Sequence, residues 1–200
     1  SKAFKKRFGC SPLAFRNQNK ALEKKYLEAS LKTENDNQHP ASLEYVIEEL
    51  PHFESLYLPY QGSYTDFDTI NQYWERLFKY VEQYDLIDPR TAFFSENLDD
   101  NEISEDINCR INLSITLEKP LVISPSDFFQ TKTHTPQKYV KFIHKGSITT
   151  LEATYRNIYA LWLNDIQLEF ADKAILEFYL NHDEGVAPEA YLTEIYIPFS

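Results

Sequence analysis

Gly-Ser-Tyr-Thr-Asp-Phe-Asp, residues 62–68, indicates an internal repeat, because Gly-Ser-Ile-Thr-Thr-Leu-Glu has the same pattern at residues 146–152. The two glycines lie 84 residues apart, and glycine tolerates turn conformations that other residues avoid. In each copy a threonine stands three residues before an acidic residue, a capping-box arrangement that predicts the start of a helix. The sequence therefore predicts two copies of one structural unit, each with a glycine turn leading into a helix.

Apolar residues follow each of these stretches at helical spacing. They are Ile70, Trp74, Leu77, Phe78 and Val81 in the first copy and Tyr155, Ile158, Leu161 and Trp162 in the second. The spacing predicts one amphipathic helix per copy.

Segments typical of strands flank each expected helix. They cover about 43–50, 53–60, 91–95 and 107–117 in the first copy and about 127–133, 138–144, 175–180 and 190–197 in the second. Pro51-His52 and Pro136 are expected to form turns, and the acidic stretches 96–106 and 181–189 are expected to be exposed loops. The prediction is an α+β domain of two pseudo-symmetric strand-strand-helix-strand-strand repeats, with an antiparallel sheet and a cleft between them.

The last expected strand carries an acidic residue in an apolar setting. Side chains alternate along a strand, so Thr193, Ile195 and Ile197 are predicted to face the core. Glu194 and Tyr196 share the opposite face, where burying a carboxylate without a partner would be costly. Glu194 is therefore either solvated or paired.

Composition limits the classes of function. No apolar run approaches membrane-spanning length and the basic start is unlike a signal peptide, so we expect a cytoplasmic protein that does not contact a membrane. Cys10 and Cys109 lie far apart, and the five histidines show no metal-ligand spacing, so neither a disulfide framework nor a metal site is expected. No motif for a cofactor, a phosphate loop or a serine nucleophile is present.

Charge is unevenly distributed along the chain. Residues 1–40 hold nine Lys/Arg and four acidic residues, a net charge of +5, whereas residues 41–200 hold eleven and twenty-seven, a net charge of −16. This asymmetry favours a basic N-terminal arm suited to a polyanion and an acidic body.

Residues 3–16 read as the end of one helix, a glycine cap at Gly9, and a new helix opened by Ser11-Pro12. The stretch resembles the end of the DNA-binding domain of AraC-type transcription regulators. The resemblance implies that residues 1–32 are the C-terminal remnant of a helix-turn-helix domain, with Lys5, Lys6 and Arg7 as DNA contacts and most of the DNA-reading unit upstream. A solvated basic helix is the alternative. The polar segment 33–42 is predicted to be a linker to a domain covering 43–200.

The body resembles GyrI-like effector-binding domains. The resemblance rests on Val46-Ile47-Glu48-Glu49-Leu50-Pro51, the Gly62-Ser63-Tyr64 turn, Trp74 and Leu77, Trp162-Leu163, Glu177-x-Tyr179 and the terminal Thr193 to Pro198. In that family two repeats form an aromatic cleft for small, often lipophilic and cationic effectors, and a glutamate of the last strand faces it. The resemblance assigns Glu194 to that role and implies a buried glutamate.

Aromatic side chains support this expectation on physical grounds, because the 14 Tyr and 14 Phe residues offer faces that attract cations while burying apolar surface. The expected ligand-binding residues are Glu194, Tyr196, Tyr64, Trp162, Tyr179 and Phe94. A structural salt bridge from Glu194 to Arg110 or Arg156 is the alternative.

Three functions stay open at this point. The first is the effector-sensing, non-enzymatic part of an AraC-type regulator, which would bind a small molecule and, through its N-terminal domain, DNA. The second is a GyrI-like hydrolase that uses the same glutamate. The third is a gyrase-inhibitor-type module that binds another protein.

Overall fold

A computed structural model describes residues 43–99, 108–119, 121, 128–166, 168–182 and 185–200. The chain divides into two compact units. The larger unit comprises Glu44–Thr154 and Gln167–Ser200, and the smaller comprises Ser1–Leu43 and Tyr155–Ile166. The AraC-like stretch, its Lys5, Lys6 and Arg7, and the linker at 33–42 lie outside the described residues.

The larger unit contains all eight described strands and one complete α-helix. In chain order the elements are β1 (Tyr45–Leu50), β2 (Phe53–Gln61), α3 (Phe67–Gln83), β3 (Phe93–Asn97), β4 (Arg110–Leu117), β5 (Gln130–His134), β6 (Gln137–Lys145), the 3₁₀ turn η2 (Ile148–Thr150), α4 (Leu151–Leu161), β7 (Ile175–Tyr179), the 3₁₀ turn η4 (Pro188–Ala190) and β8 (Leu192–Pro198). Helix α4 starts in this unit and ends in the smaller one, where the π-helical turn η3 (Trp162–Ile166) continues it.

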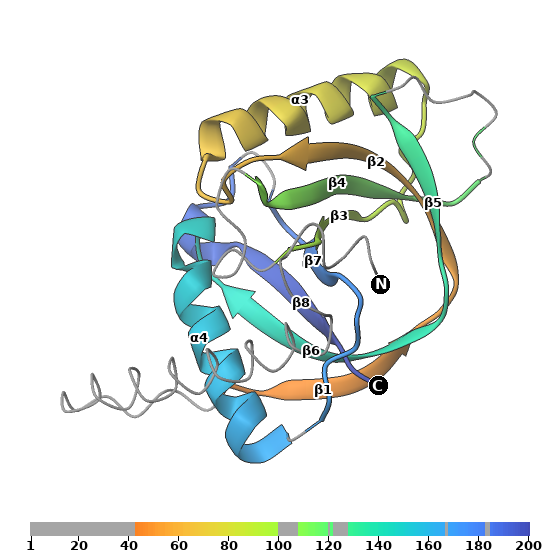
Figure 1. The fold of residues 1–200 in the computed structure, drawn as a ribbon. Helices are drawn as coiled ribbons and strands as arrows, with labels where there is room; N and C mark the ends of the chain where they lie inside the picture. Colours follow the sequence, from red (N-terminus) through yellow and green to blue (C-terminus); the bar gives the residue numbers. More distant parts are fainter. Residues whose placement is uncertain (1–42, 100–107, 120, 122–127, 167, 183–184) are drawn as a thin grey trace. The chain divides into compact units, whose positions relative to one another are not determined.

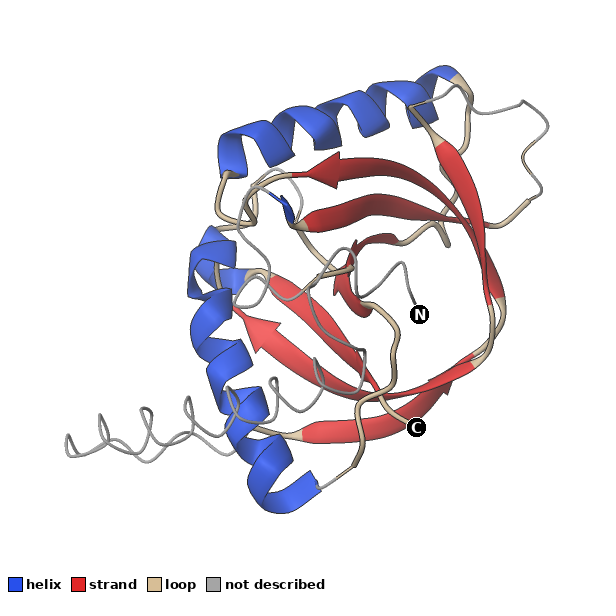
Figure 2. Cartoon of the chain, in the orientation of Figure 1, coloured by secondary structure: helices blue, strands red, loops and turns tan. Residues whose placement is uncertain are grey.

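One antiparallel sheet joins the eight strands in the order β1-β6-β8-β7-β3-β4-β2-β5. If each strand is exchanged for its counterpart in the other copy (β1 for β5, β2 for β6, β3 for β7, β4 for β8), the same order results, read backwards. The strand order thus has the pseudo-twofold symmetry that the repeat predicts, and the α+β fold of two strand-strand-helix-strand-strand copies is confirmed (Figures 1 and 2).

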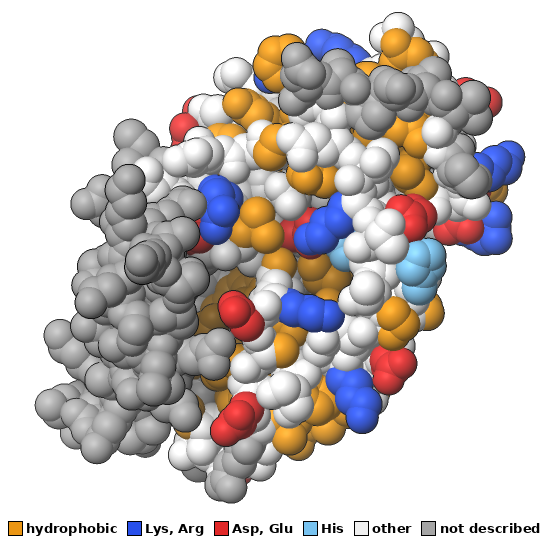
Figure 3. Space-filling view, turned by 45° about the vertical axis from the view of Figure 1, so that its right-hand side comes forward, with side chains coloured by type: hydrophobic (Ala, Val, Ile, Leu, Met, Phe, Trp, Pro, Cys, Tyr) orange, Lys and Arg blue, Asp and Glu red, His pale blue; other side chains and the backbone are white. Residues whose placement is uncertain are grey.

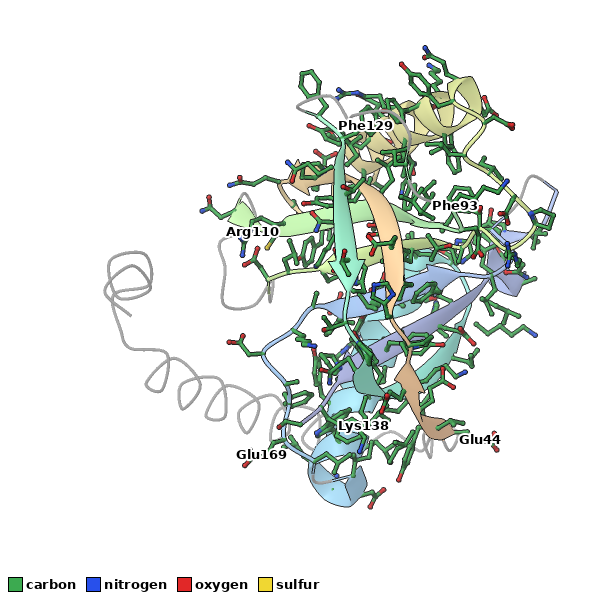
Figure 4. The ribbon with its side chains drawn as sticks, turned by 90° about the vertical axis from the view of Figure 1, so that its right-hand side faces the viewer. Glu44, Phe93, Arg110, Phe129, Lys138 and Glu169 are labelled. Atoms are coloured by element: carbon green, nitrogen blue, oxygen red, sulfur yellow. The ribbon has the colours of Figure 1, made fainter. Side chains whose placement is uncertain are left out.

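Strands β1 and β2 form no hairpin with each other, which corrects the expectation of a turn at Pro51-His52. β1 pairs with β6, and β2 pairs with β5, in one continuous antiparallel register. Pro51-His52 and Thr135-Pro136 therefore bend a two-stranded ribbon that runs from one end of the sheet to the other. Figure 4 shows this ribbon from the side, with Phe129 next to its upper end and Lys138 just beyond the bend. Through this ribbon the sheet curls into a half-barrel (Figure 1).

Helix α3 packs on the convex face of the half-barrel (Figure 1). Its buried residues Ile70, Leu77 and Val81 join a core of strand residues, which are Leu56, Leu58, Tyr60, Ile111, Leu113 and Ile115. Cys109, Ile111, Leu113 and Ile115, which stand at every second position, are all buried. Sheet residues of opposite parity face the concave side.

Both repeat glycines have positive φ, 158° at Gly62 and 141° at Gly146, as the repeat predicts. The capping-box prediction is wrong in detail. Asp66 caps α3 by accepting a hydrogen bond from the N–H of Thr69 (3.2 Å). Ser147, not Thr149, caps the second copy and accepts from the N–H of Thr149 (3.1 Å). In both copies the serine after the glycine binds the threonine main chain, so the threonine is not the cap.

Strand boundaries agree with the prediction to within a few residues, with one exception that matters for function. The stretch 96–106 was expected to be an exposed loop, yet Glu96 and Asn97 belong to β3 and Glu96 is 1% exposed. Within the described residues, no helix has the length and apolar character needed to cross a membrane.

Candidate functional site

The concave face of the half-barrel is defined here by the strand residues that point away from α3. In β8 these are Leu192, Glu194 and Tyr196, whereas Thr193, Ile195 and Ile197 are buried on the other side, as predicted. Cross-strand partners extend the face: Glu194 lies opposite Phe178 and Tyr196 lies opposite Leu176 and Lys141.

Two glutamates meet at one tyrosine on this face. The hydroxyl of Tyr196 donates to Glu48 Oε1 at 2.7 Å and lies 3.0 Å from Glu194 Oε2. Lys141 Nζ lies 3.0 Å from Glu48 Oε2 and 3.4 Å from Glu194 Oε1. We call these four residues the acidic cluster. Two carboxylates share one ammonium group, so the acidic cluster carries one excess negative charge.

The contacts within the acidic cluster favour the charged forms of Glu48 and Lys141 and the protonated form of Tyr196. Burial opposes ionisation of Glu48, but hydrogen bonds from Tyr196 and Lys141 lower the pKa of its carboxyl group. Burial, and then the two carboxylates, raise the pKa of Tyr196, so its hydroxyl stays protonated and donates. Burial likewise opposes the charged form of Lys141, but Glu48 and Glu194 outweigh it and raise its pKa. At neutral pH Glu48 and Lys141 are therefore charged and the Tyr196 hydroxyl is neutral.

A second polar cluster surrounds Glu96, whose side chain is 2% exposed. Lys132 Nζ donates to its Oε1 at 2.6 Å, and Asn112 Nδ2 donates to its Oε2 at 2.9 Å. We call Glu96, Lys132 and Asn112 the Glu96 cluster. One carboxylate and one ammonium group leave it without net charge.

His134 adjoins the Glu96 cluster and is neutral at pH 7. Burial lowers its pKa to about 4, against an opposing effect of Glu96. Its Nε2 lies 2.9 Å from Ser55 Oγ, and its Nδ1 lies 4.0 Å from Glu96 Oε1. The three residue types are those of a hydrolytic triad, but the second distance exceeds a hydrogen bond and Ser55 is fully buried. This contact therefore positions the imidazole rather than activating an accessible nucleophile.

Aromatic rings cover the face between the two clusters. Phe94 stacks on Phe178 with centroids 4.8 Å apart, and Phe178 meets Tyr196 edge-on at 5.4 Å. Tyr139 meets Tyr196 edge-on at 5.7 Å, and Phe53 meets Phe94 at 5.8 Å. Figure 3 shows lysine, acidic, histidine and hydrophobic side chains close together on one side of the molecule.

The sequence-predicted site residues fall into three groups. Glu194, Tyr196 and Phe94 share the concave face. Tyr179 points to the opposite side, where it contacts Trp74 of α3 edge-on at 5.7 Å.

Tyr64 lies in the convex-side core and donates to the main-chain oxygen of Asp99 at 2.8 Å. The expectation that Tyr64 and Tyr179 share a surface with Glu194 is therefore wrong. Trp162 belongs to the smaller unit, so the concave face of the larger unit does not include it.

Two further expectations are corrected. Glu194 is not fully buried, since its side chain is 21% exposed; the buried glutamate of this face is Glu96. The ion-pair partner of Glu194 is Lys141, whereas Arg110 pairs with Asp99 at 2.7 Å.

Sequence reasoning missed Glu48, Glu96, Lys132 and Lys141. Glu48 carried a usable signal, because it lies in the Val46 to Pro51 stretch that resembles the family. Among the residues that the structure describes, no group of three or more His, Cys, Asp or Glu could hold a metal ion.

Comparisons with solved structures show the same fold at low sequence identity. The EcmrR–DNA complex, solved by cryo-EM, superposes with a TM-score of 0.65 and 14% identity over 93% of this chain and 68% of that one. SAV2435 bound to tetraphenylphosphonium gives 0.51 and 17% identity over 79% and 94%. A hydrolase from Listeria innocua gives 0.53 and 11% identity over 81% and 94%.

Sequence comparison identifies the family. None of the curated proteins matches this sequence. The family model described as a GyrI-like small molecule binding domain matches residues 43–200, which include both clusters and the whole sheet. The chain therefore belongs to the GyrI-like small molecule binding domain family.

Proposed function

We propose that the concave face binds lipophilic organic cations and that the chain is the effector-sensing part of a transcription regulator. The observation that carries the proposal is the acidic cluster, in which Glu48 and Glu194 converge on the Tyr196 hydroxyl with one lysine between them. Its excess negative charge lies beside the stacked rings of Phe94 and Phe178.

This combination suits a cation with apolar substituents. Aromatic faces attract cations and also bury apolar surface, and a carboxylate adds charge selectivity. Lys141 Nζ lies 5.7 Å from the centroid of the Tyr196 ring, so a positive charge already occupies this part of the face. A ligand cation placed nearby would be balanced by the second carboxylate.

Two similar structures support the proposal. SAV2435 is bound to tetraphenylphosphonium, a lipophilic cation, and EcmrR is in a complex with DNA. The AraC-like residues 3–16 favour a DNA-binding domain of the AraC type at the N-terminal side. Ligand occupancy would then bias how that domain sits on its operator.

Binding without turnover is part of the proposal. In the acidic cluster both glutamates are held by Tyr196 and Lys141, an arrangement that stabilises charge. Incubation with tetraphenylphosphonium should return the ligand unchanged, as checked by mass spectrometry.

Calorimetric titration with tetraphenylphosphonium tests the charge-selecting role of Glu194. A charged interaction in a partly desolvated site is worth roughly 1.5–3 kcal/mol, so Glu194→Gln should weaken binding about ten- to a hundredfold. Binding of neutral triphenylphosphine oxide should change little.

Glu75→Gln is the matched control, because Glu75 is an exposed residue of α3 and its loss changes the net charge by the same amount. It should leave both affinities unchanged. If Glu194→Gln keeps its fold but loses affinity equally for the cation and the neutral ligand, Glu194 does not select ligands by charge.

A further inference from the structure

Tyr139 is a buried residue of β6 whose hydroxyl forms no hydrogen bond with any residue that the structure describes. The residue is 6% exposed and lies on the concave face, opposite Glu48 of β1. Its ring meets the ring of Tyr196 edge-on and packs in an apolar cluster with Phe94 and Leu176. Buried polar groups are nearly always paired, so an unpaired phenol in this position calls for an explanation.

The neighbours of Tyr139 show what kind of group could pair with it. Its ring touches Tyr196, the centre of the acidic cluster. The carboxylate of Glu96 also acts on the ionisation of its hydroxyl. Burial first, and then Glu96, raise the pKa of Tyr139 to about 12, so the hydroxyl stays protonated over the physiological range. Tyr139 thus adjoins the acidic cluster and is influenced by the carboxylate of the Glu96 cluster.

The Glu96 cluster limits the charge of the partner. Lys132 already balances Glu96 at 2.6 Å, so an ionic ligand group here would be left uncompensated. A group that accepts from the phenol and can also donate toward a carboxylate fits both neighbours. A neutral hydroxyl does both.

We propose that Tyr139 is a second, specificity-determining anchor on the concave face, which hydrogen-bonds a neutral hydroxyl group of the bound ligand. This inference rests on the proposed function, because the charge of the same ligand would lie at the acidic cluster. It narrows the ligand class to aromatic cations that carry a hydroxyl group, with Tyr139 on one side of Tyr196 and the stacked rings of Phe94 and Phe178 on the other.

Two isosteric cations test the inference by calorimetric titration: (4-hydroxymethylphenyl)triphenylphosphonium and (4-ethylphenyl)triphenylphosphonium. They share charge and shape and differ in one hydroxyl group. The wild-type protein should bind the hydroxymethyl cation about three- to tenfold more tightly, the range expected for one net hydrogen bond. Tyr139→Phe should abolish this preference and leave the affinity for the ethyl cation within about twofold.

Tyr60→Phe is the control, because Tyr60 lies in the convex-side core and its hydroxyl donates to the main-chain oxygen of Ser63 at 3.0 Å. It should preserve the preference between the two cations. The melting temperature of Tyr139→Phe should equal or exceed that of wild type, since the variant loses an unpaired polar group.

The outcomes separate the two proposals. Equal wild-type affinities for both cations, or a preference that survives in Tyr139→Phe, would overturn the role of Tyr139 while leaving cation binding intact. Failure of the wild-type protein to bind either cation would instead overturn the proposed function, and this inference with it.

Discussion

Replacing Glu96 by glutamine should destabilise the domain, because Glu96 is the most deeply buried carboxylate of the concave face. Its side chain is 2% exposed and receives hydrogen bonds from Lys132 Nζ at 2.6 Å and from Asn112 Nδ2 at 2.9 Å. Glutamine keeps the shape but offers one oxygen acceptor to two donors. One donor is therefore left without its partner.

The loss of stability in Glu96→Gln depends on whether the donor that loses its partner can form a hydrogen bond with water instead. Breaking a buried ion pair by removing one partner costs roughly 3–5 kcal/mol when the remaining charge stays buried. Lys132 is 39% exposed and can regain water, so the loss should approach that of a charged hydrogen bond, about 2 kcal/mol. Urea unfolding at pH 7 measures this difference.

A double-mutant cycle isolates the ion pair. Glu96→Gln, Lys132→Met and the double variant should give a coupling energy of about 1–2 kcal/mol. The matched cycle uses Arg90 and Glu118, an ion pair at 3.2 Å whose side chains are 72% and 26% exposed. Its coupling should stay below about 1 kcal/mol. An unchanged free energy of unfolding in Glu96→Gln would refute the reasoning. So would a coupling energy between Glu96 and Lys132 no larger than that of the surface pair.

Two further predictions concern stability. Gly62→Ala and Gly146→Ala should each lower the free energy of unfolding by roughly 1–2 kcal/mol, because alanine is strained at positive φ. The loss should be larger for Gly62→Ala, because the new Cβ would lie 2.4 Å from the buried Tyr60 hydroxyl. Gly185→Ala, with φ of 94° and no atom within 4 Å, measures strain alone; equal losses at all three glycines by urea unfolding would contradict the steric argument. Burial lowers the pKa of His134 to about 4, so between about pH 6.5 and 4 the unfolded chain binds a proton that the folded chain excludes, and stability falls as the pH falls. The loss from this group by pH 5 should reach up to about 2 kcal/mol and be absent in His134→Gln; parallel pH profiles of the two proteins would contradict it.

Local patterns predicted the parts of the fold that depend on neighbouring residues. The recurrence of Gly62-Ser63 as Gly146-Ser147 gave the two helices and their preceding turns, and alternation in the last strand gave the faces of Glu194 and Ile195. Both signals have a period fixed by backbone geometry, so they can be read from a single sequence.

Pairing between distant strands could not be read in the same way. Glu96 lies in an acidic, apolar-poor stretch, and its burial depends on Lys132 and Asn112, which are 36 and 16 residues away. The face of Tyr179 follows from the sheet register, whereas the position of Tyr64, in the turn before α3, follows from the packing of that turn against the convex-side core. Tyrosine suits either face of a sheet as well as a turn, so residue type alone could not place these two side chains.

The symmetry of the backbone and the asymmetry of its side chains together determine how a ligand would lie. Glu48 of β1 and Lys132 of β5 are 84 residues apart, the repeat offset, so the two copies place opposite charges at equivalent positions.

Asn112 and Glu194 also occupy equivalent positions, because Asn112 lies opposite the fourth residue of β3 and Glu194 opposite the fourth residue of β7. One half of the concave face therefore carries an excess negative charge, and the other half is neutral. Turning a singly charged ligand end for end would move its cation from the acidic cluster to the neutral Glu96 cluster. We therefore expect such a ligand to bind in one orientation, although the sheet itself is pseudo-twofold symmetric.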